Sequence, residues 1–65
     1  MNLKVNDTVQ LLVDLPEHLL SKGAVGVVVM EYDDPTEAYE VEFCDEHGDT
    51  TAQVALLPTQ IALQS

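Results

Sequence analysis

The residue types best suited to covalent chemistry in this chain are one thiol and two imidazoles, Cys44, His18 and His47. Cys44 is followed by Asp45 and Glu46, and carboxylates beside a thiol disfavour the thiolate that would attack a substrate. The sequence shows no pattern for an oxyanion hole or for a general base held by a third group. We therefore predict no catalytic residue and no enzymatic activity, and we interpret Cys44 as a small half-buried hydrophobe.

Two segments resemble ligand-binding loops, but each lacks a requirement of such a loop. Asp45, His47 and Asp49 alternate around an expected turn, yet a calcium loop offers about six to eight oxygen ligands and spans about 12 residues in an EF-hand. Gly23 and Gly26 are followed by β-branched residues, whereas a phosphate-binding loop leads into a helix. We predict neither a metal nor another cofactor, and we interpret residues 45–49 as a solvated hairpin tip.

Hydrophobic alternation and turn residues predict the elements that position these groups. Pro16 ends the first strand because proline lacks an N–H for the ladder, and the segment after it reads as a loop with one helical turn whose leucines plug an end of the fold. Gly48 suits a left-handed position in the last hairpin. A short 3-10 turn at residues 57–60 precedes the final strand. The predicted strands cover residues 7–13, 23–32, 37–44, 50–57 and 61–63.

Alternation along each strand also predicts which side chains form the core. Tyr39 and Phe43 face inward, whereas Glu40 and Glu42 face water. A bulge at Gly26 in the second strand would turn Val25, Val28 and Met30 inward and leave Val27 and Val29 outside as an apolar patch. The alternative is that Val27 and Val29 belong to the core of a thicker barrel. The remaining inward positions are Val9, Leu11, Val13, Val41, Ala52, Val54 and Leu56.

These elements predict an all-β fold, a small five-stranded SH3-like barrel with a short 3-10 turn before the last strand. An open, strongly curled sheet is the alternative. A chain of 65 residues forms one domain, here residues 1–65, and a domain of this size buries only about 60% of its unfolded surface. The single cysteine cannot form an internal disulfide, so packing alone, or a second copy, must hold the core.

The charge balance excludes several classes of partner. Twelve acidic residues face two lysines, the net charge is −10, and no arginine is present. Nucleic-acid affinity depends on lysine and arginine contacts with phosphates, and an anionic membrane surface repels an acidic chain. The longest apolar run, residues 24–30, is far shorter than the about 20 residues of a membrane span, and no apolar signal segment opens the chain. We therefore expect a cytoplasmic protein that binds neither nucleic acid nor membrane.

Several short motifs are spaced along the chain: Leu-Pro-Glu-His at 15–18, Lys-Gly at 22–23, Val-Gly at 25–26, Tyr-Glu-Val-Glu-Phe at 39–43 and Gly48. Through these motifs the chain from Val9 to Leu63 resembles an uncharacterised bacterial family, domain of unknown function 4926. Leu19 stands where the family leads us to expect glycine. A more distant similarity to KOW-type barrels and to the SH3-like domain of nitrile hydratase β subunits implies a shared architecture, and architecture alone does not transfer function.

Composition and expected exposure together favour a non-catalytic protein–protein interaction module. Nine acids lie between Glu31 and Asp49 without a basic residue among them. Their negative electrostatic potential attracts a basic protein partner, as in an antitoxin-like or immunity-like role. A homo-oligomeric structural protein and an accessory barrel subunit of a metalloenzyme are the alternatives, and a merely solubilising acidic face remains open. The residues that we predict to contact a partner are Val27, Val29, Glu31, Asp33, Asp34, Glu40, Glu42 and Leu57.

Overall fold

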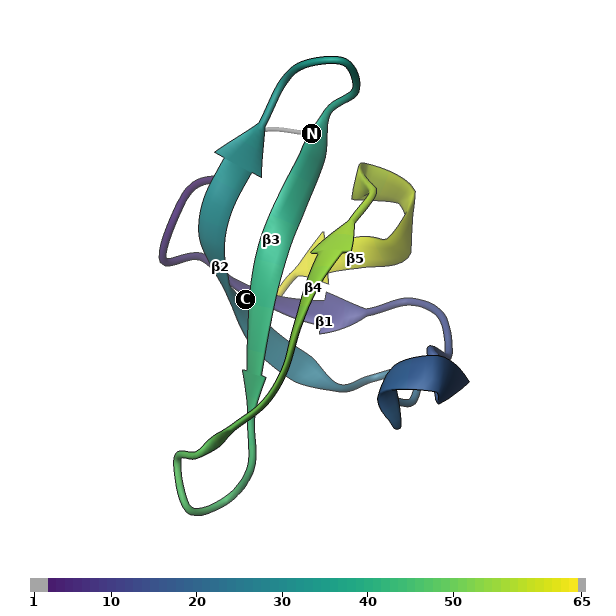
Figure 1. Cartoon of the computed structure of the whole chain (residues 1–65), viewed down its shortest axis with the longest axis vertical. Coiled ribbons are helices and arrows are strands. Elements are labelled where there is room, and N and C mark those ends of the chain that lie inside the picture. Colours follow the sequence, from purple (N-terminus) through teal and green to yellow (C-terminus); the bar gives the residue numbers. More distant parts are fainter. Residues whose placement is uncertain (1–2, 65) are drawn as a thin grey trace.

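The computed structural model describes residues 3–64 as one antiparallel sheet of five strands (Figure 1). The strand order across the sheet is β4-β3-β2-β1-β5. Two short 3-10 turns, η1 and η2, complete the secondary structure of these residues. The elements are β1 (Thr8–Leu11), η1 (Pro16–His18), β2 (Val25–Tyr32), β3 (Ala38–Cys44), β4 (Thr50–Leu56), η2 (Pro58–Gln60) and β5 (Ile61–Leu63).

The predicted all-β fold, with five strands and a 3-10 turn before the last one, is confirmed. Strands β2, β3 and β4 follow one another as hairpins, and β5 returns to pair with β1, Val9 opposite Leu63 and Leu11 opposite Ile61. The sheet curls so strongly that β1 crosses the direction of β3 (Figure 1). No strand pairing joins β4 to β5 in the described chain, so both remain edges and the barrel is open.

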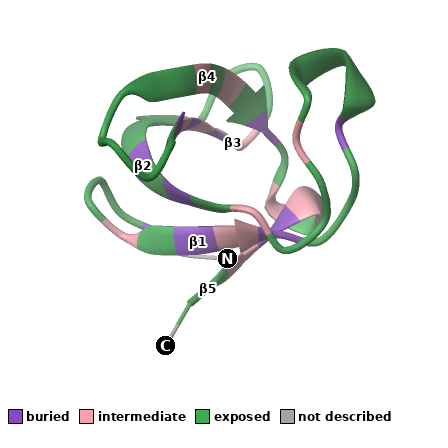
Figure 2. Cartoon of the chain, turned by 90° about the horizontal axis from the view of Figure 1, so that it is seen from below, coloured by how far each residue is buried: buried purple, intermediate pink, exposed green. Residues whose placement is uncertain are grey.

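The core lies inside this curl (Figure 2). In β3 the expected alternation is confirmed, because Tyr39, Val41 and Phe43 are buried while the residues between them are only half-buried. Leu3 joins the core from outside any strand, which alternation along strands could not predict. The other buried hydrophobic residues are Val9, Leu11, Leu15, Val28, Leu56 and Ile61, with Leu20, Ala24 and Val54 packed against them.

The first strand is shorter than predicted and Val13 is not in the core. β1 ends at Leu11, and the N–H of Leu12 donates to the carbonyl of Gln60 at 2.8 Å. The carboxylate of Asp14 then accepts a hydrogen bond from the N–H of Lys22 at 2.7 Å. These contacts turn the chain away from the sheet after Leu11, so that the side chain of Val13 is 36% exposed.

Gly26 does not carry the bulge that the sequence suggested. It pairs in regular register with Val9 on one side and Phe43 on the other. A Cβ atom at this position would lie 2.7 Å from Val41 Cγ1 and 2.9 Å from the carbonyl oxygen of Glu42. Glycine is therefore required because the neighbouring strand approaches its backbone closely.

The register of β2 shifts further along, between Val28 and Met30. Val28 faces inward as predicted, but Met30 is 51% exposed and Val25 is 46% exposed, so these two assignments to the core were wrong. The extra residue of a bulge changes the alternation only beyond it. Val25 therefore follows the regular alternation that places Gly26 inside, and Met30 shares the outer side with Val29.

The loop between β1 and β2 covers the core with two of its four leucines. Leu15 is buried and Leu20 packs against the core, and the N–H groups of each donate to the other's carbonyl at 2.8 and 3.1 Å. Leu19 lies between them in the left-handed conformation with φ 58° and is 94% exposed. The prediction that the leucines after Pro16 cover an end of the fold thus holds for Leu20 and is wrong for Leu19. Leu15, which precedes Pro16, was not part of that prediction.

Candidate interaction face

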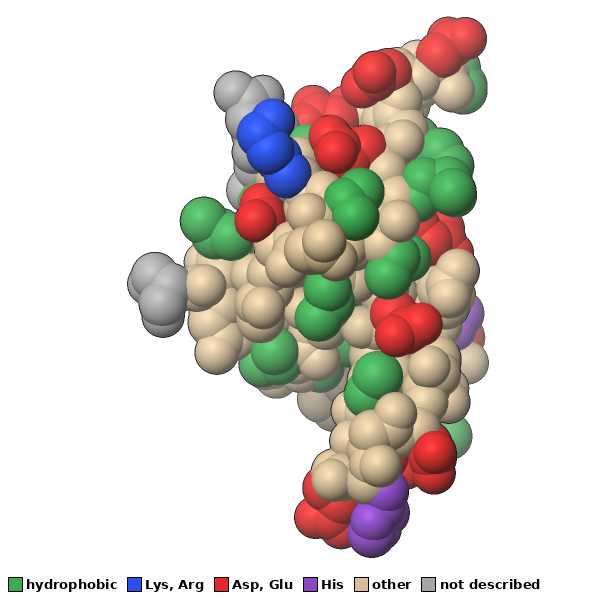
Figure 3. Space-filling model, turned by 90° about the vertical axis from the view of Figure 1, so that its left-hand side faces the viewer, with side chains coloured by type: hydrophobic (Ala, Val, Ile, Leu, Met, Phe, Trp, Pro, Cys, Tyr) green, Lys and Arg blue, Asp and Glu red, His purple; other side chains and the backbone are tan. Residues whose placement is uncertain are grey.

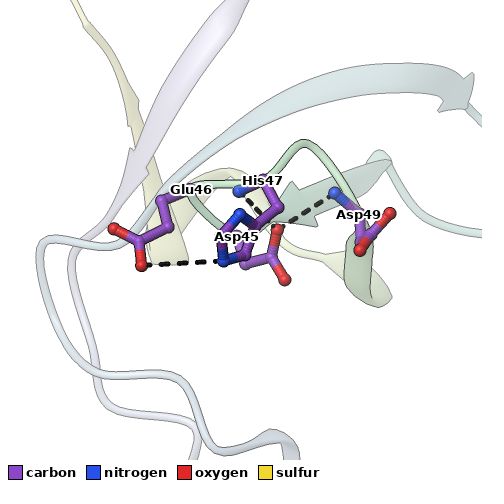
Figure 4. Close-up of polar contacts among 4 residues, drawn as sticks. All are labelled: Asp45, Glu46, His47 and Asp49. Atoms are coloured by element: carbon purple, nitrogen blue, oxygen red, sulfur yellow. Dashed lines mark hydrogen bonds and ion pairs between the residues drawn. The ribbon is translucent and has the colours of Figure 1, made fainter.

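The hairpin tip at residues 45–49 uses its polar groups to stabilise its own turn (Figure 4). The carboxylate of Asp45 accepts hydrogen bonds from the backbone N–H of His47 at 2.8 Å and of Asp49 at 3.0 Å. Gly48 adopts φ 85°, as its position in the turn required. His47 Nε2 lies 3.9 Å from Glu46 Oε1, an exposed contact. Within residues 3–64 no three His, Cys, Asp or Glu side chains converge as metal ligands would.

Cys44 is exposed, which corrects the expectation of a half-buried hydrophobe. It is the last residue of β3, and the register between β3 and β4 shifts between Phe43 and Cys44. The thiol therefore lies beyond the part of the strand that the core covers. Its Sγ atom is 3.8 Å from Glu42 Oε1.

Four exposed apolar side chains of β2 lie on the outer side of the sheet, and we call them the β2 patch. They are exposed to 46% (Val25), 38% (Val27), 36% (Val29) and 51% (Met30). The predicted exposure of Val27 and Val29 is confirmed. Figure 3 shows hydrophobic side chains in a band along this side of the molecule, with acidic side chains toward both of its ends. Adjacent exposed apolar groups of this kind are typical of an interaction surface.

Two carboxylates of β3 border the β2 patch. The register places Glu42 opposite Val27 and Glu40 opposite Met30. Glu40 Oε1 accepts a hydrogen bond from the hydroxyl of Tyr32 at 3.2 Å, and Glu40 Oε2 accepts one from Gln53 Nε2 at 3.3 Å. Desolvation and the charge of Glu40, together with this hydrogen bond, raise the pKa of Tyr32 above its usual value. Neutral donors thus orient Glu40 while its negative charge stays uncompensated.

No lysine neutralises this face. Among the residues that the structure describes, neither Lys4 nor Lys22 forms an ion pair with a carboxylate. A cationic group of another molecule can therefore approach Glu40 and Glu42 without displacing a lysine of this chain.

The other predicted contact residues lie elsewhere. Glu31 pairs with Tyr39, and its Oε2 accepts a hydrogen bond from the N–H of Val5 at 3.4 Å. Asp33 and Asp34 belong to the β2–β3 turn, and Leu57 follows β4 with 45% exposure. The structure therefore brings together Val27, Val29, Glu40 and Glu42 on one face, but not Glu31, which lies at an inward register position.

Sequence reasoning missed three members of this outer side, Val25, Met30 and Tyr32. If Gly26 is taken to face inward, regular alternation along the strand places the neighbouring Val25 on the outer side. No sequence signal marks the bulge that turns Val29 and Met30 to the same side.

Comparison with known protein families assigns the chain to one of them. The model described as domain of unknown function (DUF4926) matches residues 5–63. The chain belongs to the DUF4926 family. This match includes all five strands and both 3-10 turns, so the β2 patch and its bordering carboxylates lie inside the DUF4926 region. No curated protein and no solved structure matches the chain.

None of the helical segments between residues 3 and 64 has the length and hydrophobicity needed to cross a bilayer.

Proposed function

We propose that this protein is a small acidic, non-catalytic interaction module that binds a basic protein through the β2 patch. The observation that supports the proposal is the register that places uncompensated carboxylates opposite an exposed apolar row. Val27 and Glu42 face each other across β2 and β3, and Met30 and Glu40 do the same. Such a face offers a partner both apolar area and a site for its cations.

The two parts of the face have different physical roles. Apolar area removed from water contributes about 25 cal/mol per Å², so the exposed side chains of the β2 patch supply affinity. The carboxylates and the net charge of −10 act at longer range, where complementary charge raises the association rate and selects the partner. An antitoxin-like or immunity-like role, in which the module neutralises a basic protein, uses both properties.

We propose the cytoplasm of a bacterium as the compartment. The chain has one cysteine and therefore no internal disulfide, and exposed free thiols persist in reducing compartments. Cys44 is such an exposed thiol.

The proposal is tested by comparing two valine-to-aspartate variants with equal exposure. Val29 in the β2 patch and Val13 in the bend after β1 are both 36% exposed, so V29D and V13D change the net charge equally. We expect basic proteins captured from cell extract by the immobilised protein to be lost with V29D and retained with V13D. Capture should also weaken from about 0.1 M to about 1 M salt, because the Debye length falls from about 10 Å to about 3 Å.

Two outcomes would contradict this function. Equal capture by V29D and V13D would show that the β2 patch is not the contact surface. Sedimentation that shows the protein itself forming dimers, which V29D but not V13D dissociates, would assign the patch to a second copy of the chain.

A further inference from the structure

Strand β4 has one free backbone edge. The hydrogen bonds of β2 and β3 determine which residues of β4 point their N–H and C=O groups toward this edge. Val28 donates to the carbonyl of Asp7 at 2.9 Å, so the inward residues of β2 up to Val28 bond to β1. In an antiparallel sheet successive residues bond alternately to the two neighbouring strands. Val27 and its partner Glu42 therefore bond to each other, and Val41 bonds on the other side to Val54 of β4.

The hydrogen bonds of the β3–β4 turn independently indicate the same pairing between the residues of β3 and β4. Asp45 donates to the carbonyl of Asp49 at 2.9 Å, so the ladder counted back from the turn also has Phe43 bonding to Ala52. Residues 52, 54 and 56 thus bond to β3. Gln53 and Ala55 turn their N–H and C=O groups away from β3, and no backbone hydrogen bond joins them to another described segment.

This edge has defined ends. On one side the register shift between Phe43 and Cys44 disturbs the ladder at Thr51. On the other side the N–H of Leu57 donates to Gln60 Oε1 at 2.8 Å and is already used. The free segment at residues 52–56 carries neither a charge nor a proline, the usual features that protect an exposed edge from pairing with another strand.

The side chains beside this edge differ between the two sides of the sheet. On the inner side Ala52 and Val54 are only half-buried, because the core has no strand beyond β4 to cover them. On the outer side Gln53 lies opposite Glu42, and Ala55 lies opposite Glu40. Ala55 carries only a methyl group on this side, and the neighbouring Gln53 Nε2 donates to Glu40 Oε2 at 3.3 Å.

We propose that the basic partner adds a strand of its own to β4 at residues 52–56. This inference rests on the proposed function and specifies the partner's chemistry: lysine or arginine opposite Gln53 and Ala55, with an apolar residue between them. The two basic side chains then lie on the outer side, about two strand spacings or roughly 10 Å from β3, and extend over β4 toward Glu42 and Glu40. The apolar residue covers Val54.

Charge and strand length argue against the other arrangements. A second copy pairing through β4 would bring two chains of net charge −10 together, with the carboxylates of both β3 strands flanking the junction. The opposite edge, β5, consists of only three residues. A basic strand on β4 is the arrangement in which backbone pairing and charge act in the same direction.

The test uses a defined probe, the capped peptide Lys-Val-Lys-Val-Lys, titrated into the full chain and followed by amide NMR. We expect the amide hydrogens of Gln53 and Ala55 to exchange more slowly when the peptide binds, while that of Val54, already bonded to β3, changes little. A55P removes an outward N–H that β3 does not use, so it should weaken peptide binding about tenfold or more without unfolding the protein. The control V54P interrupts the β3 ladder and should unfold it.

A second reagent leaves the protein unchanged. The same peptide N-methylated at its lysines keeps its charge but loses the N–H groups that would pair with β4, and we expect it not to bind. Equal binding of both peptides, or no binding of either, would overturn the proposed strand addition. A wild-type dimer that A55P dissociates would also overturn it, since β4 would then pair with itself.

The two proposals fail separately. If V29D loses partner capture while A55P captures the partner fully, the β2 patch is the contact surface and strand addition at β4 is wrong.

Discussion

Leu19 is the residue whose conformation least suits its type. Its φ and ψ of 58° and 35° are left-handed, and its side chain is 94% exposed, so no packing compensates the strain. A left-handed conformation costs a non-glycine residue about 1–2 kcal/mol, while glycine loses about 0.5–1 kcal/mol through its greater freedom when unfolded. We therefore expect L19G to raise the free energy of unfolding by about 0.5–1 kcal/mol, measured by urea denaturation.

Leu57 provides the control for this substitution. It is also exposed, but its φ is −81°, an ordinary extended value. L57G should lower the free energy of unfolding because it relieves no strain, while the entropic cost of glycine and the loss of the buried part of the leucine side chain both act against the folded state. Equal effects of the two substitutions would show that Leu19 carries no strain.

Tyr39 couples stability to alkaline pH. Its hydroxyl donates to Glu37 at 2.6 Å, and this hydrogen bond, followed by burial, raises the pKa of Tyr39 above the usual tyrosine value of 10.0. The folded state therefore holds the phenol proton more tightly than the unfolded state does. The associated stability is present below pH 10.0 and is lost as pH rises through the raised pKa.

We expect Y39F to show a smaller loss of stability above this pH than the wild type, measured by urea denaturation across the alkaline range. Y32F is the comparison. The pKa of Tyr32 is raised as well, but its side chain is more exposed than that of Tyr39, so we expect Y32F to change the alkaline loss less than Y39F does. An unchanged alkaline slope in Y39F would assign the pH dependence to other groups.

At the scale of the elements, the sequence predicted what local patterns determine. The alternation of Tyr39, Val41 and Phe43, the turn at Gly48 and the 3-10 turn at Pro58–Gln60 each depend on neighbouring residues, and the structure contains all three. The extent of β1 depends instead on a distant contact, Leu12 with Gln60. Sequence patterns do not report such a contact, so that boundary was wrong.

The candidate face was predicted only in part for a similar reason. Val27, Val29, Glu40 and Glu42 follow from alternation along one hairpin, and they lie together. Gly26 signals special backbone geometry in the sequence, but a bulge and a close strand approach both favour glycine. Only the distance between a Cβ atom placed at position 26 and the carbonyl oxygen of Glu42 shows that the close strand approach is the reason.

At the scale of the whole molecule, unbalanced charge acts on the folded state. The extents of 32 × 22 × 21 Å confine a net charge of −10 within a small volume. We expect added sodium chloride to raise the melting temperature, since about 0.15 M salt limits charge repulsion to a Debye length of about 8 Å. Differential scanning calorimetry at several salt concentrations measures this effect.

The double variant E40Q/E42Q removes two of the crowded charges and should respond less to salt. A melting temperature that stays constant or falls with salt in the wild type would show that the carboxylates are already well separated.

The pairing of β1 with β5 has a consequence for how the chain emerges from a ribosome. Val9 and Leu63 are neighbours in space although almost the whole sequence lies between them. The hairpins of β2, β3 and β4 can form early, but Val9 and Leu11 keep one flank open until Ile61 has been synthesised and released from the exit tunnel. A nascent chain stalled before Ile61 would thus expose the edge of β1 in addition to that of β4, and would attract chaperones.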